Sequence, residues 1–475
     1  MAGDSEDRNA LERLGDAVST FAEDYFPDPF IFTLGLTVLA VAVVVGLTDR
    51  GPGETALAWG VGFWSVAQFS LQAALLLLAG WVLGNARVIR NGLQRIARIP
   101  NTHFQALVFA IVFGFFFGLL HSAVALIVNS MFARELAYVL EEKGVDVHYP
   151  LLVAAALVGV APAGQGVTSV APLLVASEGH FLEGEIGVIP MTEIIFTTPN
   201  LLVIIAFFVA SMIIVPLLLP PEGKRVSRSE ASTGSLLADG GRVRTDGGTI
   251  NSGLLPAARR GESRLKSIVL DSPLVGTAVG LLLLSYIGYL LTIGSPADVF
   301  EINTIITLLL GIGLVLNMKL RVYTNFLRNA WGPAGQWLIQ FQFYGGIMAI
   351  MIWSGLIGQV SLLLSTYATS TTFYPLVTFI SAIINLLVPS AGGQWIVTGE
   401  VLSTSATEVG AEHNWTILAF ILGDQLTNVV HPFVLIPVFM IAGVSFKHLG
   451  GYLVIAFGIF LSISMTASLL FGIFL

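Results

Sequence analysis

Two apolar stretches of the chain are interrupted by small and polar residues whose backbone groups could bind a ligand. Residues 374–401 contain a Pro-Ser-Ala-Gly-Gly-Gln break at 389–394, and residues 149–176 contain a similar Pro-Ala-Gly-Gln break that starts at Pro162. In a bilayer, a helix break is tolerated only where it is buried in protein or lines a wet cavity. Interrupted helices in both halves of a chain indicate the substrate site of a secondary carrier. We therefore expect a carrier with its site between these breaks.

The chemistry expected at the breaks is the binding of a small anion. Glycine lets the backbone approach a ligand closely, and the half-helix after each break points free N–H groups and a positive dipole end at it. A carboxylate can be held in this way without a cationic side chain, and the predicted membrane core has no Lys or Arg. The alternative is that both breaks are kinks packed by small residues. The candidate substrate-binding residues are Gly164, Gln165, Gly166, Thr168, Ser169, Asn200, Ser390, Gly392, Gly393, Gln394 and Trp395.

Ionisable side chains inside apolar segments form a second group of candidates. An acid at membrane depth is expensive and is by default a functional hypothesis. Asp424 lies in an apolar run, and either Asp424 or Glu193 could exchange a proton or help to neutralise Na⁺. Glu193 could instead lie at the interface, because other acids stand nearby, and His431 could be an interior hydrogen-bonding group. The ion-coupling candidates are Glu193, Asp424, Asn428 and His431, with H⁺ or Na⁺ as the coupling ion, no other cofactor and no certain metal site.

The composition is that of a polytopic membrane protein. Of 475 residues, 55% are hydrophobic and only 11% are charged, against about 25% charged residues in soluble proteins. The absence of cysteine excludes disulfides, thiolate metal sites and cysteine nucleophiles. A net charge of −8 suggests no nucleic-acid partner, and no cleavable signal peptide is visible. No hydrolase, Walker or dinucleotide-binding motif is present, so we expect no enzyme activity.

The chain divides into two membrane halves. Three segments rich in Arg and Lys, at 87–98, 220–266 and 319–328, are expected on the cytoplasmic side of an inner (plasma) membrane, together with the N-terminus. Residues 105–133 read either as one long helix or as the two arms of a re-entrant hairpin. The expected divisions are an N-terminal cytoplasmic lead-in (1–28), a first membrane half (29–219), a flexible cytoplasmic linker (220–265) and a second membrane half (266–475).

An internal match suggests that the halves are inverted relative to each other. Ala-Trp-Gly at 58–60 recurs at 330–332, and Gln-Phe at 68–69 recurs at 340–341, both at an offset of 272. The first copy is expected to start outside and the second to start at a cytoplasmic loop, so the copies run in opposite directions. The fold class expected is therefore an all-α polytopic membrane protein with about ten transmembrane helices in two inverted repeats, with broken helices or re-entrant hairpins.

Over nearly the whole membrane part, the sequence resembles the short-chain fatty acid transporter family, the carriers encoded with bacterial acetoacetate and butyrate catabolism. The motifs that carry the resemblance are Pro-Asp-Pro-Phe-Ile-Phe (27–32), Trp-Gly-x-Gly-Phe-Trp (59–64), Met-Phe-Ala-Arg-Glu (131–135), Tyr-Pro-Leu-Leu (149–152), Pro-Leu-Leu (172–174), Gln-Phe-x-Phe-Tyr (340–344) and Val-Pro-Ser-x-Gly-Gly-x-Trp (388–395). The resemblance implies uptake of small monocarboxylates and a fold like that of the broader ion-transporter group, with re-entrant hairpins and a central site.

The chain departs from the family pattern at three places. Residues 161–166 replace a Trp-Gly-Gly-Gly-Phe-Ser type of break, 121–125 replace Asn-Trp-Gly-Phe-Gly, and 398–400 replace Gln-Gly-Pro with Thr-Gly-Glu. The family's acidic positions are kept in kind at Glu193 and Asp424. These departures lie near the expected site and bear on the exact substrate and coupling ion.

Together these features predict a secondary active transporter of short-chain fatty acids, coupled to H⁺ or Na⁺ and operating by symport. The expected partners are a small carboxylate and the lipid bilayer, and a homo-oligomer is left open. The alternatives are a carrier of another organic anion (a dicarboxylate or an amino acid), an intramembrane hydrolase using Ser390 with His431, and a passive channel. A dicarboxylate would call for a membrane-core arginine, which the sequence lacks.

Overall fold

The structure, a computed structural model, describes residues 29–231, 242–245, 248–251, 264–293, 302–317, 319–356, 359, 366–389, 391–432 and 434–474. The expected lead-in (1–28) lies outside these residues, as does most of the expected linker after Ala231. Apart from one small hairpin of two strands, the regular structure of the described part is helical, which confirms the all-α membrane class.

The elements of the first half are α2 (Pro29–Leu47), α3 (Pro52–Ser65), α4 (Ala67–Gly84), α5 (Arg87–Ala97), α6 (His103–Leu120), α7 (Ser122–Glu142), α8 (Tyr149–Leu157), η1 (Val158–Gln165), α9 (Val170–Val175), α10 (Glu183–Ile186), η2 (Met191–Glu193) and α11 (Thr198–Leu217). Those that follow are α12 (Arg228–Ala231), β1 (Arg242–Thr245), β2 (Gly248–Asn251), α13 (Arg264–Asp271), α14 (Pro273–Ile293), α16 (Ile302–Asn317), α17 (Leu320–Trp353), α19 (Phe373–Leu387), α20 (Ala391–Val409), α21 (His413–Asn428), α22 (Ile436–Ala442) and α23 (Phe446–Phe474).

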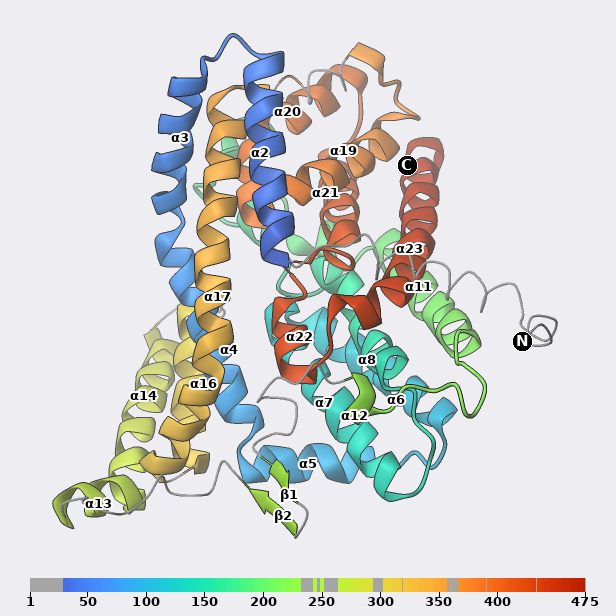
Figure 1. Ribbon diagram of the computed structural model, residues 1–475. Helices are drawn as coiled ribbons and strands as arrows, with labels where there is room; N and C mark the ends of the chain where they lie inside the picture. Colours follow the sequence, from blue (N-terminus) through green and yellow to red (C-terminus); the bar gives the residue numbers. More distant parts are fainter. Residues whose placement is uncertain are drawn as a thin grey trace.

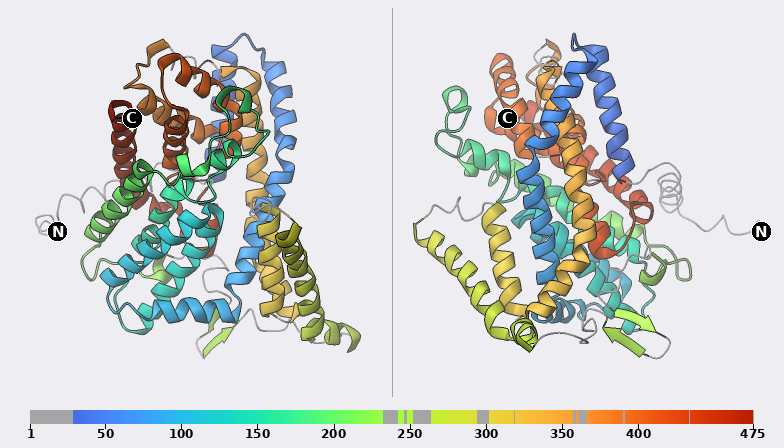
Figure 2. Two further views of the ribbon diagram at one scale, coloured as in Figure 1. Left: turned by 180° about the vertical axis from the view of Figure 1, so that it is seen from behind. Right: turned by 60° about the vertical axis from the view of Figure 1, so that its left-hand side comes forward.

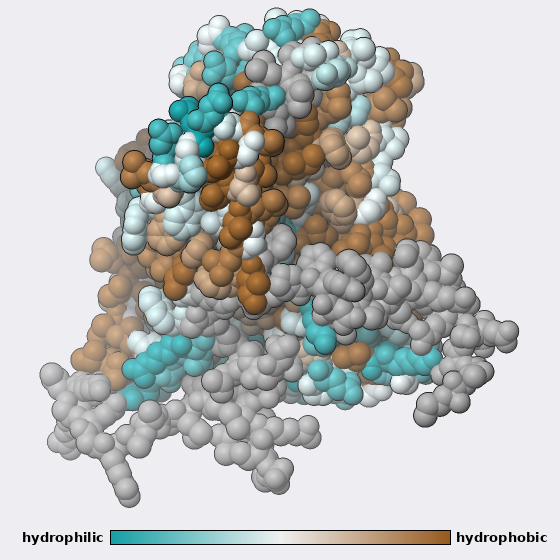
Figure 3. Space-filling model, turned by 45° about the horizontal axis from the view of Figure 1, so that its top comes forward, coloured by the Kyte–Doolittle hydropathy of each residue, from teal (hydrophilic) through white to brown (hydrophobic). Residues whose placement is uncertain are grey.

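The helices are long and apolar enough for a multi-pass membrane protein. Within the described residues, five helical segments have the length and hydropathy of a membrane span, the bent pair α3–α4 would make a sixth, and four further apolar helices are shorter. This agrees with the approximate number of spans expected. Hydrophobic residues gather in a belt on the face shown in Figure 3, with hydrophilic residues above and below it. Exposed side chains such as Leu274 (76%) and Leu282 (68%) on α14 fit contact with lipid.

Two bodies stand side by side in Figures 1 and 2. The first is a tall bundle of α2, α3, α4, α14, α16 and α17, in which α17 packs along α2, α3 and α4. Aromatic rings fill its centre, where Phe343 lies 5.5–5.7 Å from Phe63, Phe30 and Trp59. The second body contains α6 to α11 and α19 to α23, and it holds both helix breaks.

The packing supports an inverted repeat. In the first body α3–α4 runs down and α17 runs up in Figure 1, and the Gln342 side-chain amide donates to the Ser70 hydroxyl (2.5 Å). These two residues stand at the same offset of 272 as the matched sequence segments. Residues at equivalent positions of two repeats contact each other in this way when they lie next to the two-fold axis that relates the repeats.

The second body repeats the same relation. In the first half α6 packs along α8 and η1 with α11 against them, and in the second half α19 packs along α21 with α23 against them. The hairpin α6–α7, which turns at His121, opens towards the lower end of Figure 1, whereas α19–α20 opens towards the upper end. Residues 105–133 therefore form the two arms of a hairpin. The similar breaks at 162–169 and 389–394 thus belong to non-equivalent elements, a broken helix and a hairpin turn.

Glycines allow the close approach of hairpin and broken helix in both halves. A Cβ atom on Gly118 of α6 would overlap the carbonyl oxygen of Gly159 in η1, and one on Gly423 of α21 would overlap the carbonyl oxygen of Thr378 in α19. Small residues are the usual means by which membrane helices approach each other closely.

The N-terminal end of α8 is tied to the segment that leaves the first half. His148 is buried, and its Nδ1 accepts a hydrogen bond from the Val226 amide (3.0 Å), so the neutral ring donates from Nε2 to the Tyr452 hydroxyl on α23 (2.7 Å). Burial lowers the pKa of His148 to about 4, with Arg225 and His448 lowering it further and Asp146 opposing them. The start of the 220–265 segment is therefore held against the second body.

Substitution of Gly118 tests the close packing of α6 on η1. We expect Gly118→Ala to destabilise the fold by about 1–3 kcal/mol, because the added methyl group must push two backbones apart. The readout is the thermal unfolding midpoint in detergent. Gly458→Ala on α23 is the matched control, since a Cβ there meets no atom within 4 Å; equal midpoints for both variants and the wild type would contradict the packing.

Protonation of His148 should weaken the fold. Since its folded pKa is lowered, the stabilisation is complete above the unfolded pKa of 6.5 and is lost as the pH falls towards 4. We expect the unfolding midpoint of the wild type to fall over this window and that of His148→Gln to fall less steeply. His180→Gln, which changes a histidine in a loop, should keep the wild-type slope, and the account fails if His148→Gln does so too.

Candidate functional site

A polar cavity lies where the two breaks meet. Its volume is about 50 Å³, enough for a few water molecules or a small polar group. It is formed by the start of α7, the η1–α9 break, the start of α20 and one face of α21. The lining residues are Ser122, Ala163, Gly164, Thr168, Ser169, Val170, Ala171, Ala391, Phe420, Ile421, Asp424 and Gln425. A second cavity, between α8, α11 and α23, is smaller, at about 10 Å³, and lined mostly by apolar residues.

Asp424 is the acidic residue of this cavity. Its side chain is 1% exposed, Oδ2 accepts from the Gln425 side-chain amide (2.6 Å), and Oδ1 has no hydrogen-bond partner among the described residues. No Lys or Arg is among the described residues that line the cavity. A buried carboxylate with one oxygen left unpartnered is costly as an anion, so a proton or a cation from outside would be favourable beside it. The Gln425 side chain packs directly against Gly164, and a residue with a Cβ atom at position 164 would collide with it.

The first break is held in place by the end of α6. The amide of Val167 donates to the Leu119 carbonyl (3.0 Å), and the Thr168 hydroxyl donates to the Leu120 carbonyl (2.9 Å). Gly166 permits this contact, because a Cβ at that position would overlap the Leu119 carbonyl group. Thr168 and Ser169 line the cavity as expected. The break between η1 and α9 is therefore hydrogen-bonded to the end of α6 within the protein.

Gln165 and Asn200 bind each other directly behind the break. The Gln165 side-chain amide donates to Asn200 Oδ1 (2.8 Å), and Asn200 Nδ2 donates to the carbonyls of Ile195 (2.7 Å) and Gln165 (3.2 Å). Both side chains are buried. These hydrogen bonds hold η1 against the start of α11, so the pair has a structural role.

The second break adjoins the first across the cavity. A Cβ atom on Gly392 would touch the Val170 side chain of α9 at 3.0 Å, and Ala391, the first residue of α20, lines the cavity. Ser390 lies outside the described residues, and Gly393 is half-buried beside this contact. Gln394 donates to the Ser381 carbonyl (2.8 Å), and Trp395 packs on Phe420 (5.0 Å). The last two side chains therefore support the site from behind.

The other ion-coupling candidates are not among the described residues that line the cavity. Glu193 is exposed on η2, where its carbonyl accepts from Asn414 (3.4 Å). Asn414 precedes Asp424 by ten residues on α21, which corresponds to roughly 15 Å. Asn428 accepts from Asn385 (2.8 Å), and His431 is buried with Nε2 at 3.2 Å from the Leu386 carbonyl. The structure therefore brings Asp424 alone of these four to the cavity.

Two polar residues of the site were missed in the sequence. Gln425 directly follows Asp424 and binds it, and Ser122 belongs to the polar interruption at the α6–α7 turn. Ser122 could have been found from the sequence, because a His-Ser pair in the middle of an apolar run marks a break.

Among the described residues, no group of three or more His, Asp or Glu side chains is placed to hold a metal ion.

The fold and site define a polytopic membrane transporter built on two opposed hairpins. The family model described as short chain fatty acid transporter matches residues 10–472, and the chain belongs to this family. A curated relative from Escherichia coli K12, named "Putative short-chain fatty acid transporter", is 29% identical over 94% of this chain and 96% of its own. One of the same name from Haemophilus influenzae is 29% identical over 93% and 96%. The solved structure of the Alcanivorax borkumensis YdaH transporter covers 94% of this chain and 98% of its own, with 16% identity and a TM-score of 0.46.

Removal of the Asn200 side chain tests the structural task of the Gln165–Asn200 pair. We expect Asn200→Ala to lower stability by about 1–3 kcal/mol, since it leaves the Gln165 amide and the Ile195 carbonyl unpartnered in a buried place. The measurement is the unfolding midpoint in detergent. Asn91→Ala, at an exposed position of α5, is the control and should behave as wild type. A normal midpoint for Asn200→Ala would instead favour a role in binding.

Proposed function

We propose that this member of the family is a secondary active transporter of short-chain fatty acids and similar small monocarboxylates, of the acetoacetate and butyrate type, coupled to H⁺ or Na⁺. The observation that carries the proposal is the position of Asp424, buried in the cavity between the two breaks with one oxygen unpartnered among the described residues. A carboxylate substrate bound in this cavity would place two anions side by side in a medium of low dielectric constant. A co-bound proton or sodium ion removes this repulsion, so coupling follows from the charges of the site.

The cavity lining fits a small monocarboxylate. The hydroxyls of Ser122 and Ser169 and the positive dipole end of α20, at Ala391, line the cavity and would hold the carboxylate end. Val170, Phe420 and Ile421 offer an apolar wall for a short alkyl chain. The cavity volume of about 50 Å³ disfavours long chains in this conformation.

The other candidate functions have less support. A dicarboxylate would need a cationic partner for its second carboxylate, and the described lining has none. A hydrolase using Ser390 and His431 would need the two side chains to meet, and Ser390 lies outside the described residues, whereas the family match supports transport. A membrane location follows from the apolar belt, and the inner membrane with a cytoplasmic N-terminus is our proposal. It is supported by the position of α5, α12 and the start of α17, the three basic regions, at one end of the molecule in Figure 1.

Neutralisation of Asp424 tests the coupling. In proteoliposomes with imposed H⁺ or Na⁺ gradients, wild-type protein should accumulate radiolabelled butyrate or acetoacetate. We expect Asp424→Asn to abolish accumulation and the response to the gradient while butyrate binding survives, because the amide no longer needs a cation. The matched control is Glu193→Gln, which removes the exposed acid and should leave accumulation intact.

Three results would contradict this proposal in different ways. No uptake of either acid by wild type under any gradient would overturn the monocarboxylate assignment. Uptake without accumulation would indicate a passive channel. Normal accumulation by Asp424→Asn, with loss in Glu193→Gln, would move the coupling ion to the acid outside the cavity.

A further inference from the structure

The short helix α5 lies across the lower end of the molecule in Figure 1, at a large angle to the membrane helices. Its residues divide into three sectors when they are placed at 100° intervals. Leu93 (8% exposed) and Ala97 (0%) lie in the sector that faces the protein. A second, exposed sector contains the arginines of the helix and its C-terminal end, Arg87, Arg95 and Arg98. A third, also exposed, contains Val88 (60%) and Ile96 (38%), and exposed Ile99 (57%) lies two residues beyond the last residue of the helix.

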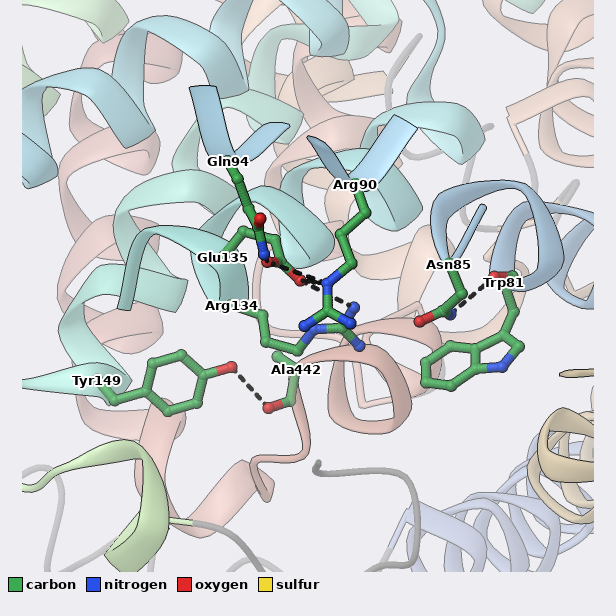
Figure 4. Close-up of polar contacts among 8 residues, drawn as sticks. All are labelled: Trp81, Asn85, Arg90, Gln94, Arg134, Glu135, Tyr149 and Ala442. Atoms are coloured by element: carbon green, nitrogen blue, oxygen red, sulfur yellow. Dashed lines mark hydrogen bonds and ion pairs between the residues drawn. The ribbon is translucent and has the colours of Figure 1, made fainter. Parts of the chain in front are cut away.

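The inner sector fixes the orientation of the other two. Glu135 of α7 is buried and accepts from Gln94 Nε2 (2.7 Å) and Arg90 Nε (3.4 Å) on α5, as Figure 4 shows. Arg134, beside Glu135, lies 5.6 Å above the Trp81 ring of α4. The Glu135 contacts join α5 to the second body, and α4 and α16 of the first body also lie against α5. The helix therefore cannot rotate without breaking a buried ionic contact, and its basic and apolar sectors keep facing outward.

The exposed arginines carry charge that this part of the chain does not balance. Arg90 and Arg134 share Glu135, but within the described residues Arg87, Arg95 and Arg98 take part in no ion pair. Lys143 adds another positive charge, with its ammonium group bound to the Arg98 carbonyl (2.5 Å). Exposed Glu142 precedes Lys143 and offsets part of the charge near Arg98, so Arg87 and Arg95 are the clearest unbalanced positions.

We propose that the outer face of α5 is a docking surface for anionic phospholipid headgroups. Arg87 and Arg95 would bind the phosphodiester groups, and Val88, Ile96 and Ile99 would enter the acyl boundary beside them. An amphipathic helix with adjoining basic and apolar sectors is the usual form of a segment that lies in the membrane interface, and anionic lipid adds electrostatic attraction to each basic residue. A soluble anion would satisfy the arginines but would leave the apolar sector in water.

The experiment titrates the full-length protein in neutral detergent with phosphatidylglycerol and follows the unfolding midpoint, because a ligand that binds the folded state raises it. Phosphatidylcholine and inorganic phosphate are run in parallel. We expect phosphatidylglycerol alone to give a saturable increase. The double variant Arg87→Gln/Arg95→Gln should need roughly 25-fold more of this lipid for the same increase, at about fivefold for each arginine.

Two further variants separate lipid docking from general charge effects. Lys319→Gln/Arg328→Gln removes two exposed charges from another basic segment and should titrate as wild type. Val88→Gln/Ile99→Gln keeps the arginines and should weaken the response to phosphatidylglycerol, since the acyl contact is lost. Equal stabilisation by phosphatidylcholine or by phosphate, an unchanged titration for the arginine variant, or an equal loss in the lysine–arginine control would each overturn the proposal. Transport is not measured, so the outcome is independent of the proposed substrate.

Discussion

The structure depends on one constraint: where a membrane helix is interrupted, its free backbone N–H and C=O groups must be hydrogen-bonded within the protein. At the first break, the amide of Val167 and the hydroxyl of Thr168 bind the last carbonyls of α6, while Asn200 closes the region behind them. The turn of one hairpin therefore completes the broken helix beside it. This arrangement brings the start of α7, the η1–α9 break and the start of α20 around one polar cavity, with α21 as its floor. The need to hydrogen-bond the interrupted backbone therefore determines both where the cavity lies and why it is polar.

The negative charge of Asp424 is the feature of the site on which the proposed coupling depends. Asp424 is set in a cavity whose other described lining residues are neutral, and its neighbour Gln425 supplies one hydrogen bond in a place that Gly164 keeps open. Such a carboxylate and a carboxylate substrate are compatible only with a cation between or on them. The membership of the short-chain fatty acid transporter family and the size and lining of the cavity both support the monocarboxylate substrate that we propose.

Sequence reasoning could predict the parts of this site but not their pairing. Apolar length, the two breaks and buried Asp424 are local features, and all three were correctly expected. For Glu193 the sequence leaves two interpretations open, an ion-coupling acid or a residue at the interface. The η2 turn leaves its side chain exposed, and a turn of three residues has no periodicity from which this could be predicted. The likeness between 149–176 and 374–401 suggested equivalent elements, whereas packing shows a broken helix and a hairpin. Gln425 was missed because its role arises only from contact with Gly164 and Asp424.

The most direct test of the account is whether a small carboxylate binds between the two breaks. The chain has no cysteine, so a single cysteine in Ala391→Cys can be labelled selectively with a thiol reagent. Butyrate together with the coupling ion should slow labelling at this position, at the start of α20, and should leave labelling of Ser177→Cys, an exposed control, unchanged. Protection that saturates with butyrate would support binding in the cavity. Equal labelling with and without butyrate, in a preparation that transports it, would contradict the account.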